Sequence, residues 1–166
     1  MTEKKLNNND KYFMGRALHY AALAARRGET PVGAVIVCDG EIVSWGYNLR
    51  ETKKSALAHA EIIALSRANK ALDGWRLHKC DLYVTMEPCP MCAGAIVNAR
   101  IRRVVYGCAD SKAGSFGSVL SLNDFPLNHK PEIVGGVMAE ESRKLLSDFF
   151  RSLRAKKSAD KNAGKQ

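Results

Sequence analysis

Hydrophobic residues in the first third of the chain follow two spacings, one typical of helices and one typical of strands. Residues 10–27 carry apolar side chains at helical spacing, with Asp10 at the position of an N-cap. Residues 32–37 and 41–45 are short apolar runs, and the Asp39-Gly40 pair between them is a common hairpin turn. The pattern therefore predicts a helix followed by a β-hairpin.

The remainder of the chain alternates between segments of helical and strand-like spacing. Residues 48–55 and 109–129 are polar or rich in glycine and are predicted to be loops, the second with a short helical piece. This alternation after a hairpin predicts an α/β fold, with a mixed sheet covered by helices on both faces. The predicted helices are residues 59–71, a helix that starts between Pro88 and Pro90 and continues through residues 92–100, and residues 139–154. The predicted strands are residues 81–85, 103–106 and 132–134.

The composition is that of a globular protein. The 166 residues are 46% hydrophobic, and no apolar run approaches the roughly 20 residues that span a membrane. Met1–Lys11 is polar and lacks the apolar core of a secretory signal, so we expect a cytoplasmic location. We expect residues 1–156 to form a single domain, and residues 157–166, which are basic and of low complexity, to form a disordered tail.

The chain is strongly basic, with 26 lysine and arginine residues against 17 acidic ones and a net charge of +9. A basic segment at the C-terminus favours a polyanionic partner such as RNA. The alternative is a solvated tail that only improves solubility. The basic residues of this segment are Arg151, Arg154, Lys156, Lys157, Lys161 and Lys165, opposed by Asp160 alone.

Two of the five cysteines lie in a pattern typical of metal ligands. They belong to Pro88-Cys89-Pro90-Met91-Cys92, which follows His59-Ala60-Glu61 along the chain. One imidazole and two thiolates leave a zinc ion one ligand short of a closed tetrahedral shell, as in catalytic sites. His-x-Glu followed by Pro-Cys-x-x-Cys is the known sequence pattern of the zinc-dependent nucleobase deaminases. The other cysteines, Cys38, Cys80 and Cys108, lie near apolar segments and are expected to be buried and reduced.

Both halves of this pattern are predicted to lie at helix N-termini, whose partial positive charge favours thiolates at Cys89 and Cys92. Glu61, two residues after His59, can reach a water molecule at the open position. In a deaminase it would take a proton from this water and pass it to a ring nitrogen, and hydroxide attack on the amidine-like carbon would then release ammonia. The pattern therefore predicts Glu61 as the catalytic residue.

A Cys-x-x-Cys pair also occurs in redox sites and in structural zinc sites. A structural site would need a fourth ligand, and His78, Cys80 and Cys108 are the nearby candidates. Such a protein could be a catalytically idle RNA-binding module. Glu61 argues against this alternative, because a structural site has no use for its carboxylate.

Beyond this pattern, the chain resembles the bacterial tRNA-specific adenosine deaminase family, within the cytidine-deaminase-like superfamily. The zinc pattern is shared with cytosine, guanine and deoxycytidylate deaminases, whereas residues 87–95, the loop at Asp110 and Phe149-Phe150-Arg151 favour the tRNA enzymes. The similarity covers residues 10–156. The matching segments are residues 28–35, 58–62, 82–95, 103–107, 110–114, 128–129 and 146–151.

This resemblance implies a three-layer α/β/α fold of cytidine-deaminase type with a central mixed five-stranded sheet. It implies one Zn²⁺ per subunit, held by His59, Cys89 and Cys92, with Glu61 as the proton shuttle. It further implies a homodimer that binds the anticodon stem-loop of tRNA and converts adenosine at the wobble position to inosine. The alternative is a free-base or nucleoside deaminase for guanine or cytosine, which would act on the small molecule alone and show no salt-sensitive RNA binding.

The resemblance also assigns two substrate-binding residues. Asn48 matches the asparagine that hydrogen-bonds the flipped base, and Asp110 matches a residue near the target ribose. Each has a simpler alternative, since asparagine is common in turns and Asp110 could cap a short helix. Phe149 and Phe150 could stack on anticodon bases, although adjacent helical positions cannot both face the same way. Residues 55–57 depart from the family, which commonly has an acidic residue and a proline there, and this difference affects the pocket wall.

Overall fold

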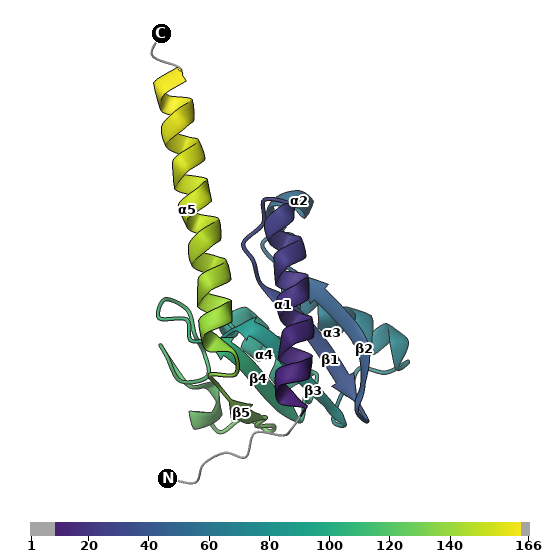
Figure 1. Ribbon diagram of the computed structural model, residues 1–166. Coiled ribbons are helices and arrows are strands. Elements are labelled where there is room, and N and C mark those ends of the chain that lie inside the picture. The colour runs from purple at the N-terminus through teal and green to yellow at the C-terminus, as the bar shows by residue number, and fades with distance from the viewer. Residues whose placement is uncertain (1–8, 164–166) are drawn as a thin grey trace.

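The structure is a computed structural model that describes residues 9–163, and a five-stranded sheet lies at its centre (Figure 1). The order of the strands is β2-β1-β3-β4-β5. β1 runs antiparallel to β2 and β3, whereas β3, β4 and β5 run parallel to one another. The sheet is therefore mixed, as predicted. The strands are β1 (Gly33–Cys38), β2 (Glu41–Tyr47), β3 (Cys80–Met86), β4 (Arg103–Cys108) and β5 (Glu132–Val134).

Helices cover both faces of this sheet and complete three layers (Figure 1). α3 (Ala60–Ala71) and α4 (Pro90–Asn98) pack on one face. α1 (Asp10–Arg26) and α5 (Ala139–Ala163) pack on the other, where α5 contacts β4 and α1. A one-turn helix, α2 (Arg50–Lys53), and a 3₁₀ turn (Leu122–Asp124) lie in the connections.

The alternation of strand side chains produces two separate cores. Because successive strand residues point to opposite faces, Ile36 and Leu82 are buried beneath α3 and α4. Their neighbours Val35 and Tyr83 are buried beneath α1 with Phe13. The central strands are apolar on both faces for this reason, which is why they appear in the sequence as continuous apolar runs.

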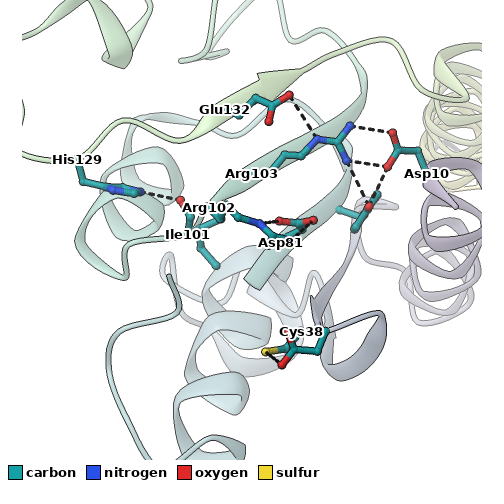
Figure 2. Close-up of polar contacts among 10 residues, drawn as sticks. Asp10, Cys38, Asp81, Ile101, Arg102, Arg103, His129 and Glu132 are labelled. Carbon is teal, nitrogen blue, oxygen red and sulfur yellow. Dashed lines mark hydrogen bonds and ion pairs between the residues drawn. The ribbon is translucent and has the colours of Figure 1, made fainter. Parts of the chain in front are cut away.

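The prediction that Asp10 caps the first helix is wrong. Asn9 occupies the cap position, and Asp10 is the first helical residue, fully buried. Its carboxylate oxygens bind the two terminal nitrogens of the Arg103 guanidinium on β4 at 2.7 and 2.8 Å. It also accepts a hydrogen bond of 2.8 Å from the hydroxyl of Tyr83 (Figure 2 shows this cluster). A tertiary ion pair, rather than helix capping, therefore explains the acid at this position.

Two segments predicted to be irregular are helical. The polar loop at 48–55 contains α2, and α5 continues to Ala163 through residues 157–163, which we expected to be disordered. Alanine and lysine favour helix, and neither glycine nor proline interrupts residues 139–163. Residues 164–166, including Lys165, lie outside the described residues. No helix in the described part of the chain is long and apolar enough to cross a membrane.

Candidate active site

The first turns of α3 and α4 bring the three candidate metal ligands together. His59 is the N-cap of α3 and Cys89 is the N-cap of α4, with Cys92 in the first turn of that helix. The Nδ1 atom of His59 lies 3.7 Å from the sulfur of Cys89 and 3.5 Å from the sulfur of Cys92. Gly46 on β2 lets α3 pack closely on the sheet, because a Cβ atom there would collide with the carbonyl oxygen of Ala60 in α3.

These distances fit a tetrahedral zinc ion. Bonds of about 2.3 Å to sulfur and about 2.0 Å to nitrogen place ligand atoms roughly 3.5 Å apart. Among residues 9–163, His59, Cys89 and Cys92 are the only group of three or more such side chains that converge closely enough to hold a metal ion. The sulfur of Cys108 donates instead to the carbonyl oxygen of Thr85 at 3.6 Å. The described residues therefore supply three ligands and leave the fourth position open, as in a catalytic site.

The surroundings of the ligands favour the ionised form of one thiol. Hydrogen bonds to the sulfur of Cys89, first from Cys92 and then from His59, lower the pKa of Cys89 to about 4 in spite of its partial burial. The N-terminus of α4 adds partial positive charge beside this sulfur. A thiolate at Cys89 is the state that binds a metal ion.

Glu61 lies beside the ligands on the first turn of α3. Its side chain is 4% exposed, and burial raises the pKa of Glu61 to about 7, while the charge of His59 opposes that rise. A carboxyl group with a pKa near neutrality can both accept and donate a proton. Glu61 thus has the chemistry expected of a proton shuttle.

A cavity of about 140 Å³ is lined by two of the three ligands, His59 and Cys89, and by both predicted substrate-binding residues. Asn48 is 7% exposed, and its side-chain oxygen accepts a hydrogen bond of 3.4 Å from the backbone N–H of Arg50. Asp110 accepts hydrogen bonds from the backbone N–H groups of Lys112 and Ala113 at 2.9 and 3.2 Å. The walls are formed by Thr30, Val32, Asn48, Arg50, His59, Ala60, Glu61, Met86, Glu87, Cys89 and Asp110.

Glu29 positions Asn48, a role that the sequence did not reveal. Glu29 is fully buried behind the cavity, and its carboxylate accepts hydrogen bonds from the backbone N–H groups of Thr52 at 2.6 Å and Glu51 at 3.2 Å. The same carboxylate accepts a hydrogen bond of 3.4 Å from the Asn48 amide. Burial alone would raise the pKa of Glu29, but the donors from Thr52 and Glu51 outweigh it and lower the pKa. Glu29 thus holds α2 and orients the Asn48 side chain.

Glu87 organises the loop that carries Asp110, and sequence analysis missed this role too. Glu87 is 2% exposed and accepts hydrogen bonds from the backbone N–H groups of Asp110, Phe116 and Ser118 at 3.0–3.1 Å. The Ser118 hydroxyl also donates to it. Gly114 packs so closely that a Cβ atom there would collide with the carboxylate. In the sequence, this role was indicated only by the position of Glu87 at the start of residues 87–95, which resemble the tRNA-specific adenosine deaminases.

Comparison with known proteins agrees with this site. Residues 7–108 match the family model for the cytidine and deoxycytidylate deaminase zinc-binding region. A tRNA-specific adenosine deaminase of Bacillus subtilis is 48% identical over 151 residues, which cover 90% of this chain and 94% of the relative. The chain belongs to the bacterial tRNA-specific adenosine deaminase family. Its counterpart in Haemophilus influenzae is 45% identical over 92% of this chain and 89% of the relative.

Solved structures of related deaminases share the fold. One comes from a study of A-to-I editing by tRNA:A34 deaminases at the wobble position of transfer RNA. It has a TM-score of 0.79 and 42% sequence identity to this chain, and the match covers 81% of this chain and 99% of that one. A guanine deaminase from Bacillus subtilis has a TM-score of 0.58 and 31% identity, covering 74% of this chain and 88% of that chain. The predicted three-layer fold is confirmed, and zinc, the cofactor of this family, fits the three ligands.

The structure also places the segment before His59 and the phenylalanine pair of α5 in this tRNA-specific adenosine deaminase family member. Before His59, the hydroxyl and carbonyl of Ser55 accept hydrogen bonds from the backbone N–H groups of Leu57 and Ala58, and they hold a turn in which Leu57 is 62% exposed. On α5, Phe149 lines a groove against α1, whereas Phe150 is 41% exposed. Phe150 is therefore the exposed member of the pair, and its ring meets the ring of Phe149 edge-on at 5.4 Å between centroids.

Proposed function

We propose that this protein deaminates adenosine to inosine at the wobble position of tRNA, with zinc held by His59, Cys89 and Cys92. The observation that carries the proposal is the convergence of three ligands beside a cavity that His59, Cys89 and the buried Glu61 line together. It is supported by 48% identity to a tRNA-specific adenosine deaminase over nine tenths of the chain. A zinc ion bound here supplies the Lewis acidity that makes water nucleophilic near neutral pH.

The protein's own residues move the protons and hold the base. Glu61 takes a proton from the attacking water and delivers it to the purine ring nitrogen. It then takes the second proton, from the hydroxyl group now bonded to the ring carbon, and passes it to the amino group, so that the C–N bond breaks and ammonia leaves. Asn48 hydrogen-bonds the adenine, with its amide oriented by Glu29. Asp110 lines the same cavity and binds the ribose, on a loop that Glu87 holds. A target in the anticodon loop need not be extracted from a duplex, which lowers the cost of flipping.

The basic part of α5 binds the tRNA backbone. Residues 151–163 are all exposed, and Figure 1 shows this end of α5 projecting beyond the rest of the molecule. Arg151, Arg154 and the lysines that follow provide a positively charged arm suited to phosphate. A tRNA substrate also implies a cytoplasmic location.

We further propose a homodimer. A groove between α3 and α4 is lined by Ile62, Leu65 and Trp75, and Trp75 is 54% exposed. Exposed apolar side chains beside a groove favour a protein contact. Sedimentation of the purified protein should give twice the mass of one chain, and a monomer at all concentrations tested would rule this out.

The test of the function is incubation of the zinc-loaded protein with total tRNA, followed by sequencing for inosine at the first anticodon position. We expect inosine there and no release of ammonia from free guanine or cytosine. Deamination of a free base without any change in tRNA would support the guanine or cytosine alternative. Glu61→Gln protein, with its zinc content measured, is the matched control.

A further inference from the structure

Two cysteines face each other at the end of β3 that is remote from the candidate active site. Cys38 ends β1, Cys80 begins β3, and they are direct partners in the antiparallel ladder. Cys80 is 1% exposed, whereas Cys38 is half-buried. β3 runs from Cys80 to Met86 before the chain reaches Cys89, so about 20 Å of strand, at roughly 3.3 Å per residue, lies between the pair and the metal ligands.

The backbone hydrogen bonds show which type of strand pair this is. The N–H and C=O groups of one strand residue point towards the same side. The Cys80 carbonyl accepts a hydrogen bond of 3.0 Å from Arg102, before β4, and the Cys80 N–H donates to Leu77 at 2.9 Å. Neither group is directed at β1, so Cys38 and Cys80 form a non-hydrogen-bonded pair.

This type of pair has the geometry that a disulfide requires. In non-hydrogen-bonded antiparallel pairs the Cα atoms lie about 4.5 Å apart and the side chains make their closest approach. Disulfides need Cα atoms roughly 4.4–6.8 Å apart. Directly opposed residues also share a face of the sheet, and both cysteines belong to the core beneath α3 and α4.

The two thiols have different surroundings. Burial, followed by a hydrogen bond with the Cys38 thiol, raises the pKa of Cys80 to about 12. The Cys38 thiol donates to the carboxylate of Asp39 at 3.7 Å, at the hairpin turn (Figure 2). Cys38 is therefore the thiol that a small oxidant reaches first, and Cys80 is the partner behind it.

We propose that Cys38 and Cys80 form a redox-modification site, at which hydrogen peroxide converts the dithiol into a reversible cross-strand disulfide. The Cys38 sulfur attacks a peroxide oxygen, the O–O bond breaks, and Cys38 becomes a sulfenic acid with release of water. The Cys80 sulfur then attacks the Cys38 sulfur, the S–S bond forms as the S–O bond breaks, and the Cys80 proton leaves in a second water. The two thiols supply the two electrons that reduce one peroxide, and a thiol reductant reverses the change.

The cross-link has a defined structural consequence. It closes the segment from Cys38 to Cys80, which contains β2, α3 and the His59 ligand. A covalent link between the ends of this segment restricts the unfolded chain. The oxidised protein should therefore melt at a higher temperature than the reduced protein.

The test is peptide mapping of zinc-loaded protein after treatment with hydrogen peroxide and alkylation of the remaining thiols. We expect a Cys38–Cys80 peptide, lighter by two hydrogen atoms than its two parts, which separates after treatment with dithiothreitol. Cys38→Ser should abolish this peptide and the rise in Tm. Cys108→Ser, a matched change at a buried cysteine that bonds to a carbonyl oxygen, should abolish neither.

Two results would overturn the proposal. In the first, Cys80 can still be alkylated after denaturation, which shows that it has not formed a disulfide. Cys38 is then found either oxidised beyond sulfenic acid or still reduced in excess peroxide. The other is an equal rise in Tm on oxidation of the Cys38→Ser variant. Neither readout depends on deaminase activity, so the outcome is independent of the proposed function.

Discussion

Asp10 and Asp81 each bind an arginine through two hydrogen bonds, but at very different depths (Figure 2). The Asp10 and Arg103 side chains are 0% and 9% exposed, whereas those of Asp81 and Arg102 are 12% and 58% exposed. Replacing each aspartate by asparagine removes the same charge and nearly preserves shape. The comparison therefore isolates the effect of burial on the free energy of unfolding.

The expected magnitudes differ severalfold. Among residues 9–163, Asp10→Asn leaves the buried Arg103 with one ion-pair partner, Glu132, which is 3.7 Å away and 56% exposed. Breaking a buried ion pair on one side costs about 3–5 kcal/mol, and the retained amide oxygen places this variant near the lower value. Asp81→Asn should cost less than about 1 kcal/mol, because water screens the Arg102 pair. The Asp10–Arg103 ion pair fixes the start of α1, and this helix ends three residues before Glu29, which orients Asn48 in the active site.

Urea and thermal unfolding of the two variants and the parent measure this difference. At about 2–4 °C per kcal/mol for a chain of this size, Asp10→Asn should lower Tm by roughly 6–12 °C and Asp81→Asn by less than about 4 °C. Equal urea m-values would show that the unfolded states are comparable. If both variants lost the same stability, burial would not determine the strength of these ion pairs and our account of Asp10 would be refuted.

Three further predictions concern the active site and the tRNA. Glu61→Gln should lower turnover by about 10²-fold or more with zinc content unchanged, because the amide cannot carry a proton; a fully active variant would exclude the shuttle. Glu29→Gln should lower turnover through Asn48, so Glu29→Gln combined with Asn48→Ala should be no worse than Asn48→Ala alone; additive losses would mean that Glu29 acts by another route. Truncation after Arg154 should weaken tRNA binding and reduce the slope of its salt dependence by about 0.7–0.9 logarithmic units for each phosphate that the removed residues neutralise; an unchanged slope would show that these residues do not touch RNA.

Local patterns in the sequence were sufficient for most of the regular elements, though not for α2, and for the metal ligands. The sequence predicted β5 with the bounds observed, and α3 and β4 within a few residues. It also predicted that His59, Cys89 and Cys92 converge, because His-x-Glu and Pro-Cys-x-x-Cys are short patterns of neighbouring residues. By contrast, the continuation of α5 to Ala163 was missed, because composition was taken to indicate disorder although the same residues favour helix.

The order of helices and strands, the zinc-binding chemistry and the acidic residue beside it could be predicted from the sequence, since periodicity and short motifs depend on neighbours along the chain. The tertiary structure decided which polar residues support that chemistry. Asp10 bonds to Arg103 across 93 residues, and Glu87 bonds to Ser118 across 31. A buried carboxylate requires donors, and only the folded chain brings those donors within reach.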